Sequence, residues 1–312
     1  MTGMSSSRLL LLDSASLYFR AFYGVPDRSD PGVVPTNAVR GFLDMMASLV
    51  ERGRPTHLAA CWDNDWRPAF RVAALPSYKS HRVGDPAGGE DVPADLEVQV
   101  PIIVEALAAL GVPRVGADGF EADDVIGTLT ERHRGAMPVD IVTGDRDLFQ
   151  LVDDTDRVTV VYTARGGVRQ PDLVDEAFLR EKYGVPTGRA YADLAVLRGD
   201  TSDGLPGVAG VGEKTAAKLI TTYGDLRSLR AAIDGGDPAI KGAQRARLEA
   251  ASAYLDAAPS VVNVVRDIDL PFTQEDLALP TQVSDPSLMS RLAVDHGLTS
   301  SFDRVVTALG IA

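Results

Sequence analysis

Nine carboxylates fall into five short clusters of this sequence, and several of them directly follow apolar runs. They are Asp13, Asp63, Glu121, Asp123, Asp124, Asp145, Asp147, Asp200 and Asp203. We assign no ligand role to the scattered histidines or to the single cysteine, and oxygen-only ligand sets select Mg²⁺ or Mn²⁺ over zinc. If the nine acids converge, they suit two adjacent divalent ions, an arrangement that supports phosphodiester hydrolysis.

Three short apolar runs are predicted to be the strands that position the first acids. Arg8–Asp13, His57–Asp63 and Val139–Asp145 lack clean alternation, as buried parallel strands do, and each ends in aspartate. The carboxyl ends of parallel strands share one edge of a sheet, where ligands bind. We therefore expect the three terminal carboxylates to point into a common crevice.

The remaining pattern predicts helices between the strands and a helical second half. A fourth strand is expected at Val158–Tyr162, and the chain should turn helical from about Thr187. Helices are expected at Val34–Arg52, Leu96–Leu110, Ala122–Arg132 and, as the final one, Ser287–His296. Asp85–Asp95 is rich in glycine, proline and acids, so we expect it to be mobile. Strands alternating with helices indicate an α/β fold with a mostly parallel sheet.

The other acid clusters permit two interpretations. Glu121 and Asp124 would share one helix face, and burying them with Asp123 would be costly without a cation. Asp200 and Asp203 fit one helix face or a tight helix-ending turn. Taken singly, each cluster is also explained by a solvated surface or by helix capping, since acids in a first helical turn are favoured by the macrodipole.

Leu205–Tyr223 has the spacing of a helix-hairpin-helix, in which a glycine turn precedes an amphipathic helix. Such a turn aims backbone N–H groups at a phosphate, and lysines on the accessible side add positive charge. The glycines are Gly207, Gly210 and Gly212, and the lysines are Lys214 and Lys218. An ordinary linker with convenient glycines is the alternative.

A basic stretch runs from residue 67 to residue 82 without an acid. Its lysine and arginines are Arg67, Arg71, Lys79 and Arg82. Tyr78 stands beside Lys79, and an aromatic ring next to cations can stack on a base while the cations hold phosphates. On its own, the stretch would more often be a solvated face.

Length and charge limit the protein class. The chain has 312 residues, one cysteine and a formal net charge of −13, which at first argues against a nucleic-acid partner. Without the nine carboxylates the charge would be −4, and bound divalent ions would add positive charge. No run is long enough for a signal peptide or membrane span, so we expect a soluble cytoplasmic protein of about two domains.

The motifs of this sequence resemble those of a known family, the bacterial 5′-nucleases. These include the 5′→3′ exonuclease domain of DNA polymerase I with its stand-alone and phage relatives, kin of the flap endonucleases. The matching motifs span residues 8–225 in family order. They are LLLLDSASLYFRAFYG (9–24), CWD (61–63), LPSYKSHR (75–82), GFEADDVIG (119–127), VTGDRDLFQLV (142–152) and RGDTSDGLPGVAGVGEKTA (198–216).

The resemblance implies a PIN-like nuclease fold with a central, mostly parallel sheet flanked by helices, a helical arch and a helix-hairpin-helix subdomain. On this basis residues 1–186 form the nuclease region, with the arch at about 66–105. Residues 187–312 form a helical region, with the hairpin at about 198–225. The implied activity is two-metal hydrolysis near DNA 5′ ends, nicks and flaps, including RNA-primed flaps, in replication and repair. The implied protein is a monomer acting at the nucleoid, with two or three Mg²⁺ or Mn²⁺ ions and K⁺ at the hairpin.

The resemblance also implies roles for individual residues. Asp13, Asp63, Glu121 and Asp123 correspond to a first metal site, and Asp124, Asp145, Asp147, Asp200 and Asp203 to a second. Lys79 and Arg82 correspond to arch-base groups that contact the scissile phosphate, and are the expected catalytic cations. Tyr78 corresponds to a stacking position, Arg20 to a basic residue near the cleft, and Arg67 and Arg71 to the start of the arch.

One residue departs from the family pattern. Gly204 follows Asp203 where the family often has asparagine, which puts one hydrogen bond near the second metal in doubt. Two alternatives remain at this stage: a non-catalytic protein that binds DNA structures, and a PIN-type ribonuclease. A haloacid-dehalogenase-type phosphatase is disfavoured, because Asp13 is followed by Ser14 and Ala15 and not by a second nearby aspartate.

Overall fold

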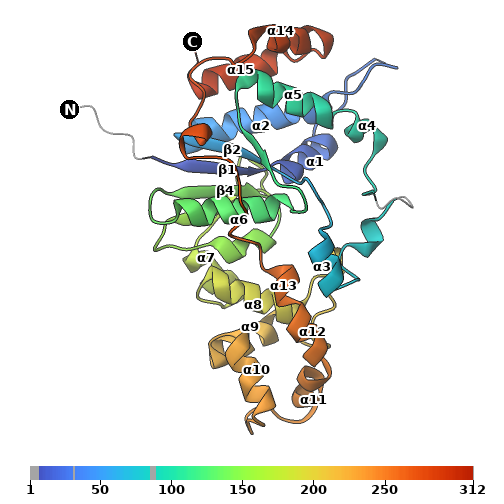
Figure 1. The fold of residues 1–312 in the computed structure, drawn as a ribbon, viewed down its shortest axis with the longest axis vertical. Coiled ribbons are helices and arrows are strands. Elements are labelled where there is room, and N and C mark those ends of the chain that lie inside the picture. Colours follow the sequence, from blue (N-terminus) through green and yellow to red (C-terminus); the bar gives the residue numbers. More distant parts are fainter. Residues whose placement is uncertain (1–6, 31, 85–88, 312) are drawn as a thin grey trace, which may run out of the picture.

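A twisted, mostly parallel sheet forms the centre of the molecule (Figure 1). The computed structural model describes residues 7–30, 32–84 and 89–311, and within them a six-stranded sheet has the order β3-β2-β1-β4-β5-β6. The strands are β1 (Leu9–Asp13), β2 (His57–Trp62), β3 (Arg114–Gly116), β4 (Val139–Thr143), β5 (Val158–Tyr162) and β6 (Asp172–Val174). Only the β5–β6 pairing is antiparallel. The predicted α/β class is confirmed.

The strand boundaries differ slightly from those expected. β1 ends at Asp13, but β2 ends at Trp62 and β4 at Thr143, so Asp63 and Asp145 lie in the loops that follow their strands. β3 and β6 were not predicted, because each has three residues and such a short run carries no readable periodicity.

Helices cover both faces of the sheet, because alternate residues of each buried strand point to opposite sides. The helices of this layered part are α1 (Ser14–Gly24), α2 (Asn37–Gly53), α5 (Val100–Leu110), α6 (Ala122–His133), α7 (Glu176–Tyr183), α8 (Gly188–Arg198), α14 (Pro286–Asp295) and α15 (Thr299–Leu309). Leu10 and Leu12 pack into one apolar cluster with α2, α5 and α15, whereas Leu9 and Leu11 pack into the other with α6 and α8.

Three helix predictions need correction. Leu96–Leu110 is not one helix, because α4 (Ala94–Glu97) ends before α5 begins and the buried side chain of Gln99 bonds Ala38 N and Asp95 O at the break. The helical half begins with α7, before residue 187. The final helix is α15, which packs on α2 and whose serine- and threonine-rich start gave little signal.

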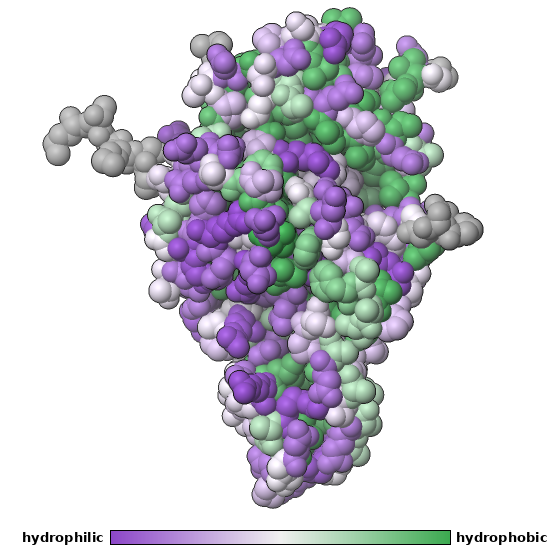
Figure 2. Space-filling view, in the orientation of Figure 1, coloured by the Kyte–Doolittle hydropathy of each residue, from purple (hydrophilic) through white to green (hydrophobic). Residues whose placement is uncertain are grey.

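The segment predicted to form the arch, residues 66–105, crosses several short elements. It contains α3 (Ala69–Ala74), a 3₁₀ turn at Ser80–Arg82, α4 and the first residues of α5, and Val83 pairs with Glu90 in an isolated bridge. Of the stretch expected to be mobile, residues 85–88 lie outside the described residues. Figure 2 shows apolar side chains gathered on the surface over α3.

A bundle of shorter helices extends from the sheet at the opposite end from α14 (Figure 1). It comprises α9 (Glu213–Tyr223), α10 (Leu226–Asp234), α11 (Gly242–Ala250), α12 (Ser252–Ala257) and α13 (Pro259–Val262). Its core joins the apolar cluster that also contains Leu9 and Leu11. Within the described ranges, no helix is long and apolar enough to cross a membrane.

The close approach between α6 and the segment after α13 yields a stability prediction. A Cβ on Gly127 would lie 2.6 Å from Val265 O and 2.8 Å from Val264 Cγ2. We expect Gly127→Ala to lower the free energy of unfolding by about 2 kcal/mol, since overpacking forces the backbone apart. Urea unfolding would measure the change. Gly24→Ala is the control, because no atom lies within 4 Å of its added Cβ; equal losses in both variants would contradict the assignment.

Candidate active site

A cavity of about 1100 Å³ opens at the carboxyl edge of the parallel strands. Five of the nine predicted acids, from four separate segments, line it, as the edge rule for parallel sheets predicts. They are Asp13, Asp63, Glu121, Asp123 and Asp145. Acids that are distant in the sequence therefore meet in one cavity, as expected for Asp13, Asp63 and Asp145.

Local hydrogen bonds fix these carboxylates in place. Asp13 ends β1 and caps α1, accepting from Ser16 N at 3.1 Å, and its second oxygen accepts from the Thr143 hydroxyl at 2.7 Å. Asp63 accepts from Ala122 N at 2.8 Å, which ties the end of β2 to the start of α6. Two strands and one helix therefore hold the wall.

Burial and mutual repulsion disfavour the charged forms of these acids. Burial and the nearby charge of Asp63 raise the pKa of Asp13 to about 7. Burial and the charges of Asp13 and Asp145 hold the pKa of Asp123 well above its usual range. The pKa of Asp63 is raised as well, mainly by burial. A bound cation would relieve this repulsion.

A second group of acids adjoins the first through Asp145. Burial, and then the charges of Asp145, Asp203 and Asp200, hold the pKa of Asp147 well above its usual range. Asp200 opens the short 3₁₀ turn Thr201–Asp203 and accepts from Ser202 N at 2.8 Å. The predicted tight turn is thus present, and its acids lie within electrostatic reach of Asp147.

Two cations from the arch base face the acids. Lys79 Nζ donates to Glu121, and Arg82 Nη2 donates to Asp203 at 2.6 Å. Lys79 has left-handed backbone, with φ of +46°, a conformation that is rare for non-glycine residues and concentrates at functional sites. Its N–H donates to Asp203 O at 3.0 Å, so the arch base rests directly on the turn that carries the second acids.

Gly204 is required by this contact. It has a φ of +73°, and a Cβ there would lie 2.1 Å from Ser77 O. The departure from the family pattern at this position therefore permits close packing between the turn and the arch base.

The structure corrects several expected roles. Arg71 is 2% exposed, and its guanidinium bonds Glu121 and Asp124, so it is not available to DNA. Tyr78 is 4% exposed and its hydroxyl donates to Glu121 at 2.8 Å, which excludes base stacking in this conformation. Arg67 braces the same loop by donating to Tyr78 O at 2.6 Å.

Asp124 also differs from the expected second-site ligand. Its side chain is fully buried, its two oxygens engage Arg71, and it accepts from Val265 N at 2.8 Å and from Glu121 N. A carboxylate with this many donors has a structural role, because it is already paired and hydrogen-bonded.

The predicted hairpin lies between α8 and α9. Gly207 and Gly210 have φ of +66° and +71°, and Gly212 caps α9. Lys214 and Lys218 are exposed, as a DNA-facing surface requires. Arg20 is half-buried and lines the cavity.

Several cavity residues were missed by sequence reasoning. The outer wall contains aromatic side chains and two acids from the arch segment. The aromatic residues are Tyr18, Phe19, Tyr23, Trp62 and Trp66, and the acids are Glu90 and Glu97. The closely spaced aromatics of α1 are a visible signal, but they also fit a core helix, and only the fold shows that they border the carboxylates.

The donor set fits a hard divalent ion, although the acids are not arranged as a finished site. Within the described ranges, no three acidic, histidine or cysteine side chains are preformed to hold a metal. Lys79 and Arg82 pair with two of the acids, whereas Asp13 and Asp123 face each other as like charges. Oxygen-only donors that repel one another are suited to Mg²⁺ or Mn²⁺ once these ion pairs open.

Comparison with known proteins decides the family. The N-terminal resolvase-like domain of 5′-3′ exonucleases matches residues 8–184, and their C-terminal SAM fold matches residues 186–285. The chain belongs to the 5′-3′ exonuclease family. It is 55% identical to a 5′-3′ exonuclease of Streptomyces coelicolor, covering 96% of this chain and 99% of that one. It is 47% identical to a 5′-3′ exonuclease of Mycobacterium tuberculosis over 97% and 98% of the two chains.

Other relatives and solved structures agree with the fold. DNA polymerase I of Mycobacterium tuberculosis is 41% identical over 97% of this chain, which spans 32% of that protein. The bacteriophage T5 flap endonuclease, solved with DNA and metal ions, has a TM-score of 0.64 and 18% identity over 97% of this chain and 98% of that one. Human GEN1 with Holliday junction DNA has a TM-score of 0.64 and 16% identity, covering 97% and 73%. The enzyme thus shares their architecture.

The raised pKa of Asp13 gives a stability prediction for this exonuclease without divalent ions. The pKa of Asp13 is about 7 in the folded protein and 3.8 ordinarily, so the folded state binds the proton of this carboxyl more tightly than the unfolded state does. The resulting contribution to the free energy of unfolding is fully present below pH 3.8 and is lost as the pH rises through about 7. At pH 8 we expect Asp13→Asn to unfold with a free energy on the order of 1 kcal/mol higher than the wild type in EDTA. At pH 3.5 the difference should vanish in urea titrations. An unchanged difference at both pH values would contradict the electrostatic cause.

The Lys79–Glu121 pair predicts competition between the lysine and a divalent ion. Lys79→Met should bind Mn²⁺ about fivefold more tightly, since the ion no longer has to break a charged hydrogen bond. Isothermal titration would measure the affinity, with the exposed Lys214→Met as control. Weaker Mn²⁺ binding in the Lys79 variant would show that the lysine does not compete for this carboxylate.

Proposed function

We propose that this exonuclease is a structure-specific 5′ nuclease that hydrolyses phosphodiesters near DNA 5′ ends and flap junctions. The single observation that supports this is the cavity itself. Acids from β1, the loops after β2 and β4, and α6 converge there, opposite Lys79 and Arg82. That pairing of repelling carboxylates with two cations suits metal-assisted cleavage of an anionic backbone.

We propose two divalent sites. Asp13, Asp63, Glu121 and Asp123 would hold one Mg²⁺ or Mn²⁺, and Asp145, Asp147, Asp200 and Asp203 would hold another. Bound ions supply the charge that lowers the pKa of an attacking water and stabilises the leaving oxygen. Asp124 is left out of the second set because it is fully buried and both of its oxygens are bound by Arg71 and backbone N–H groups, whereas the similarly paired Glu121 lines the cavity.

The chain's own cations would orient the phosphate. Lys79 and Arg82 exchange their carboxylate partners for phosphate oxygens and so stabilise the charge that develops there. Arg20, on the same cavity wall, adds a third positive group. The aromatic side chains of the outer wall offer stacking surfaces for unpaired bases, and Tyr23 is the most exposed of them at 73%.

The hairpin would bind the duplex. Backbone N–H groups at Gly210 and Gly212, with Lys214 and Lys218, contact phosphates and read duplex structure and not base sequence. We include K⁺ at the hairpin in this proposal. Comparing duplex binding in K⁺ and in tetramethylammonium, which cannot be coordinated by carbonyl oxygens, tests it.

The substrate and cellular role follow from the same proposal. A 5′ flap, a nick or a free 5′ end, with or without an RNA primer, would be removed in replication and repair. The 41% identity to DNA polymerase I supports this role. We propose further that the enzyme acts as a monomer at the cytoplasmic nucleoid, with residues 1–186 cutting and residues 187–312 gripping the duplex.

Removing a second-site carboxylate should separate cleavage from binding. Asp147→Asn is expected to lower the single-turnover cleavage rate of a 5′-flap substrate by about 100-fold or more, because a metal site loses a ligand. DNA affinity measured in EDTA should stay within about threefold of the wild type. Asp303→Asn, an exposed acid on α15, is the control. Full activity of the Asp147 variant in Mg²⁺ would overturn the proposal.

The substrate preference can be measured by comparing the cleavage of three DNA substrates. Cleavage of a 5′-flap duplex, a nicked duplex and an RNA-primed flap at fixed Mg²⁺ shows which 5′ structure the arch admits. Cleavage of none of the three, in either Mg²⁺ or Mn²⁺, would leave the protein a binder of DNA structures.

A further inference from the structure

One arginine outside the predicted site lies against the hairpin. Gly210 has a φ of +71°, and a Cβ built there would lie 2.4 Å from Nη1 and 2.9 Å from Cζ of Arg247. The guanidinium of Arg247, on α11, therefore rests on the face of the glycine that a side chain would occupy. The sequence pattern does not indicate this contact, because Arg247 is 37 positions further along the chain than Gly210.

The side chain of Arg247 has no internal partner. Within the described ranges, it makes no hydrogen bond or ion pair, and it is exposed. Its neighbour Arg245, by contrast, donates to Ile240 O at 2.9 Å and pairs with Glu249. Arg245 therefore braces the α10–α11 connection, whereas all five donors of Arg247 remain available.

The hairpin beside it also presents unused donors. In the described part of the chain, the backbone N–H groups of Ala209, Gly210 and Gly212 have no hydrogen-bond partner, whereas Val211 N donates to Val208 O at 2.9 Å. α12, which follows α11, is held against α8, which precedes the hairpin, because the Tyr254 hydroxyl donates to Val196 O at 2.9 Å. Fixed geometry of this kind lowers the cost of binding a shared ligand.

We propose that Arg247 and the hairpin N–H groups form one clamp for a phosphate of the duplex. A planar guanidinium matches two phosphate oxygens at once, while the N–H groups of the glycine turn take the other side. The contact carries no sequence information and adds one neutralised phosphate to the footprint of the helical bundle. This assignment rests on the proposed nuclease function and deepens it by naming a duplex contact on α11.

Arg247→Ala provides the test. Fluorescence anisotropy in EDTA would measure binding to a nicked duplex with a 5′ flap over a range of KCl concentrations. We expect a Kd raised about tenfold at 0.1 M KCl and a salt slope reduced by about 1. The single-turnover cleavage rate at saturating enzyme should stay within about twofold of the wild type, because Arg247 does not reach the reacting phosphate.

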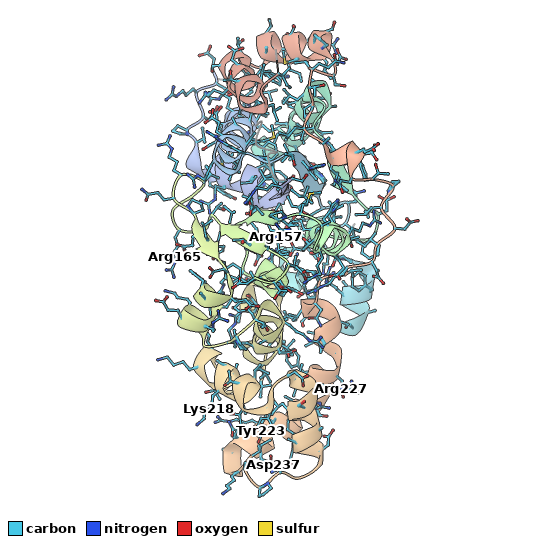
Figure 3. The ribbon with its side chains drawn as sticks, turned by 90° about the vertical axis from the view of Figure 1, so that its left-hand side faces the viewer. Arg157, Arg165, Lys218, Tyr223, Arg227 and Asp237 are labelled. Carbon is cyan, nitrogen blue, oxygen red and sulfur yellow. The ribbon has the colours of Figure 1, made fainter. Side chains whose placement is uncertain are left out.

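Two variants and one substrate make the result specific. Arg247→Lys should restore the salt slope and part of the affinity, since it keeps the charge but loses the fork. Arg227→Ala removes an exposed arginine from α10, which belongs to the same helical bundle as Lys218 (Figure 3). This variant should leave both the Kd and the salt slope unchanged. A single strand without downstream duplex should bind wild type and Arg247→Ala equally.

The outcomes separate the two proposals. If wild type cleaves the flap but Arg247→Ala binds with the affinity and slope of Arg227→Ala, the clamp is wrong and the nuclease function stands. If Arg247→Ala loses cleavage rate at saturation, or weakens single-strand binding equally, Arg247 is not a duplex contact. If wild type neither binds nor cleaves the flap, the proposed function itself fails.

Discussion

Mutual repulsion among desolvated carboxylates is the constraint around which this molecule is arranged. The parallel sheet brings Asp13 and its neighbours to one edge, and burial removes the water that would screen them. The fold cannot separate these charges, because register and helix starts fix their positions. Compensation must therefore come from positive charge, either built into the chain or taken from solution.

The positive side chains that neutralise these acids differ in how deeply they are buried. Arg71 is buried between Glu121 and Asp124 and forms an ion pair with each. Breaking either ion pair would leave an uncompensated charge in the interior. Lys79 and Arg82 are more exposed and reach the acids from the arch segment. Their pairs exchange partners at lower cost, because water and phosphate can replace a carboxylate there. The chain thus separates permanent neutralisation from neutralisation that a substrate can compete for.

Much of this site could be predicted from sequence, for a physical reason. Strand-ending aspartates converge in any parallel sheet, and glycine spacing limits how a hairpin can turn. Other features depend on contacts between distant segments. A basic run such as 67–82 does not show which of its members turns inward, so Arg71 and Tyr78 were assigned to DNA although both contact Glu121. β3, β6 and α15 were missed because they are too short, or too polar at their start, to carry a periodic pattern.

The contact between Gly204 and Ser77 ties two parts of the site into one piece. With no side chain at 204, the loop leading to Lys79 packs directly on the turn of Asp200 and Asp203. A homologue with a larger residue there must hold that loop farther away. Exchange of arches between family members would then succeed only when the turn is moved together with the loop, and the two segments should be inherited as a matched pair.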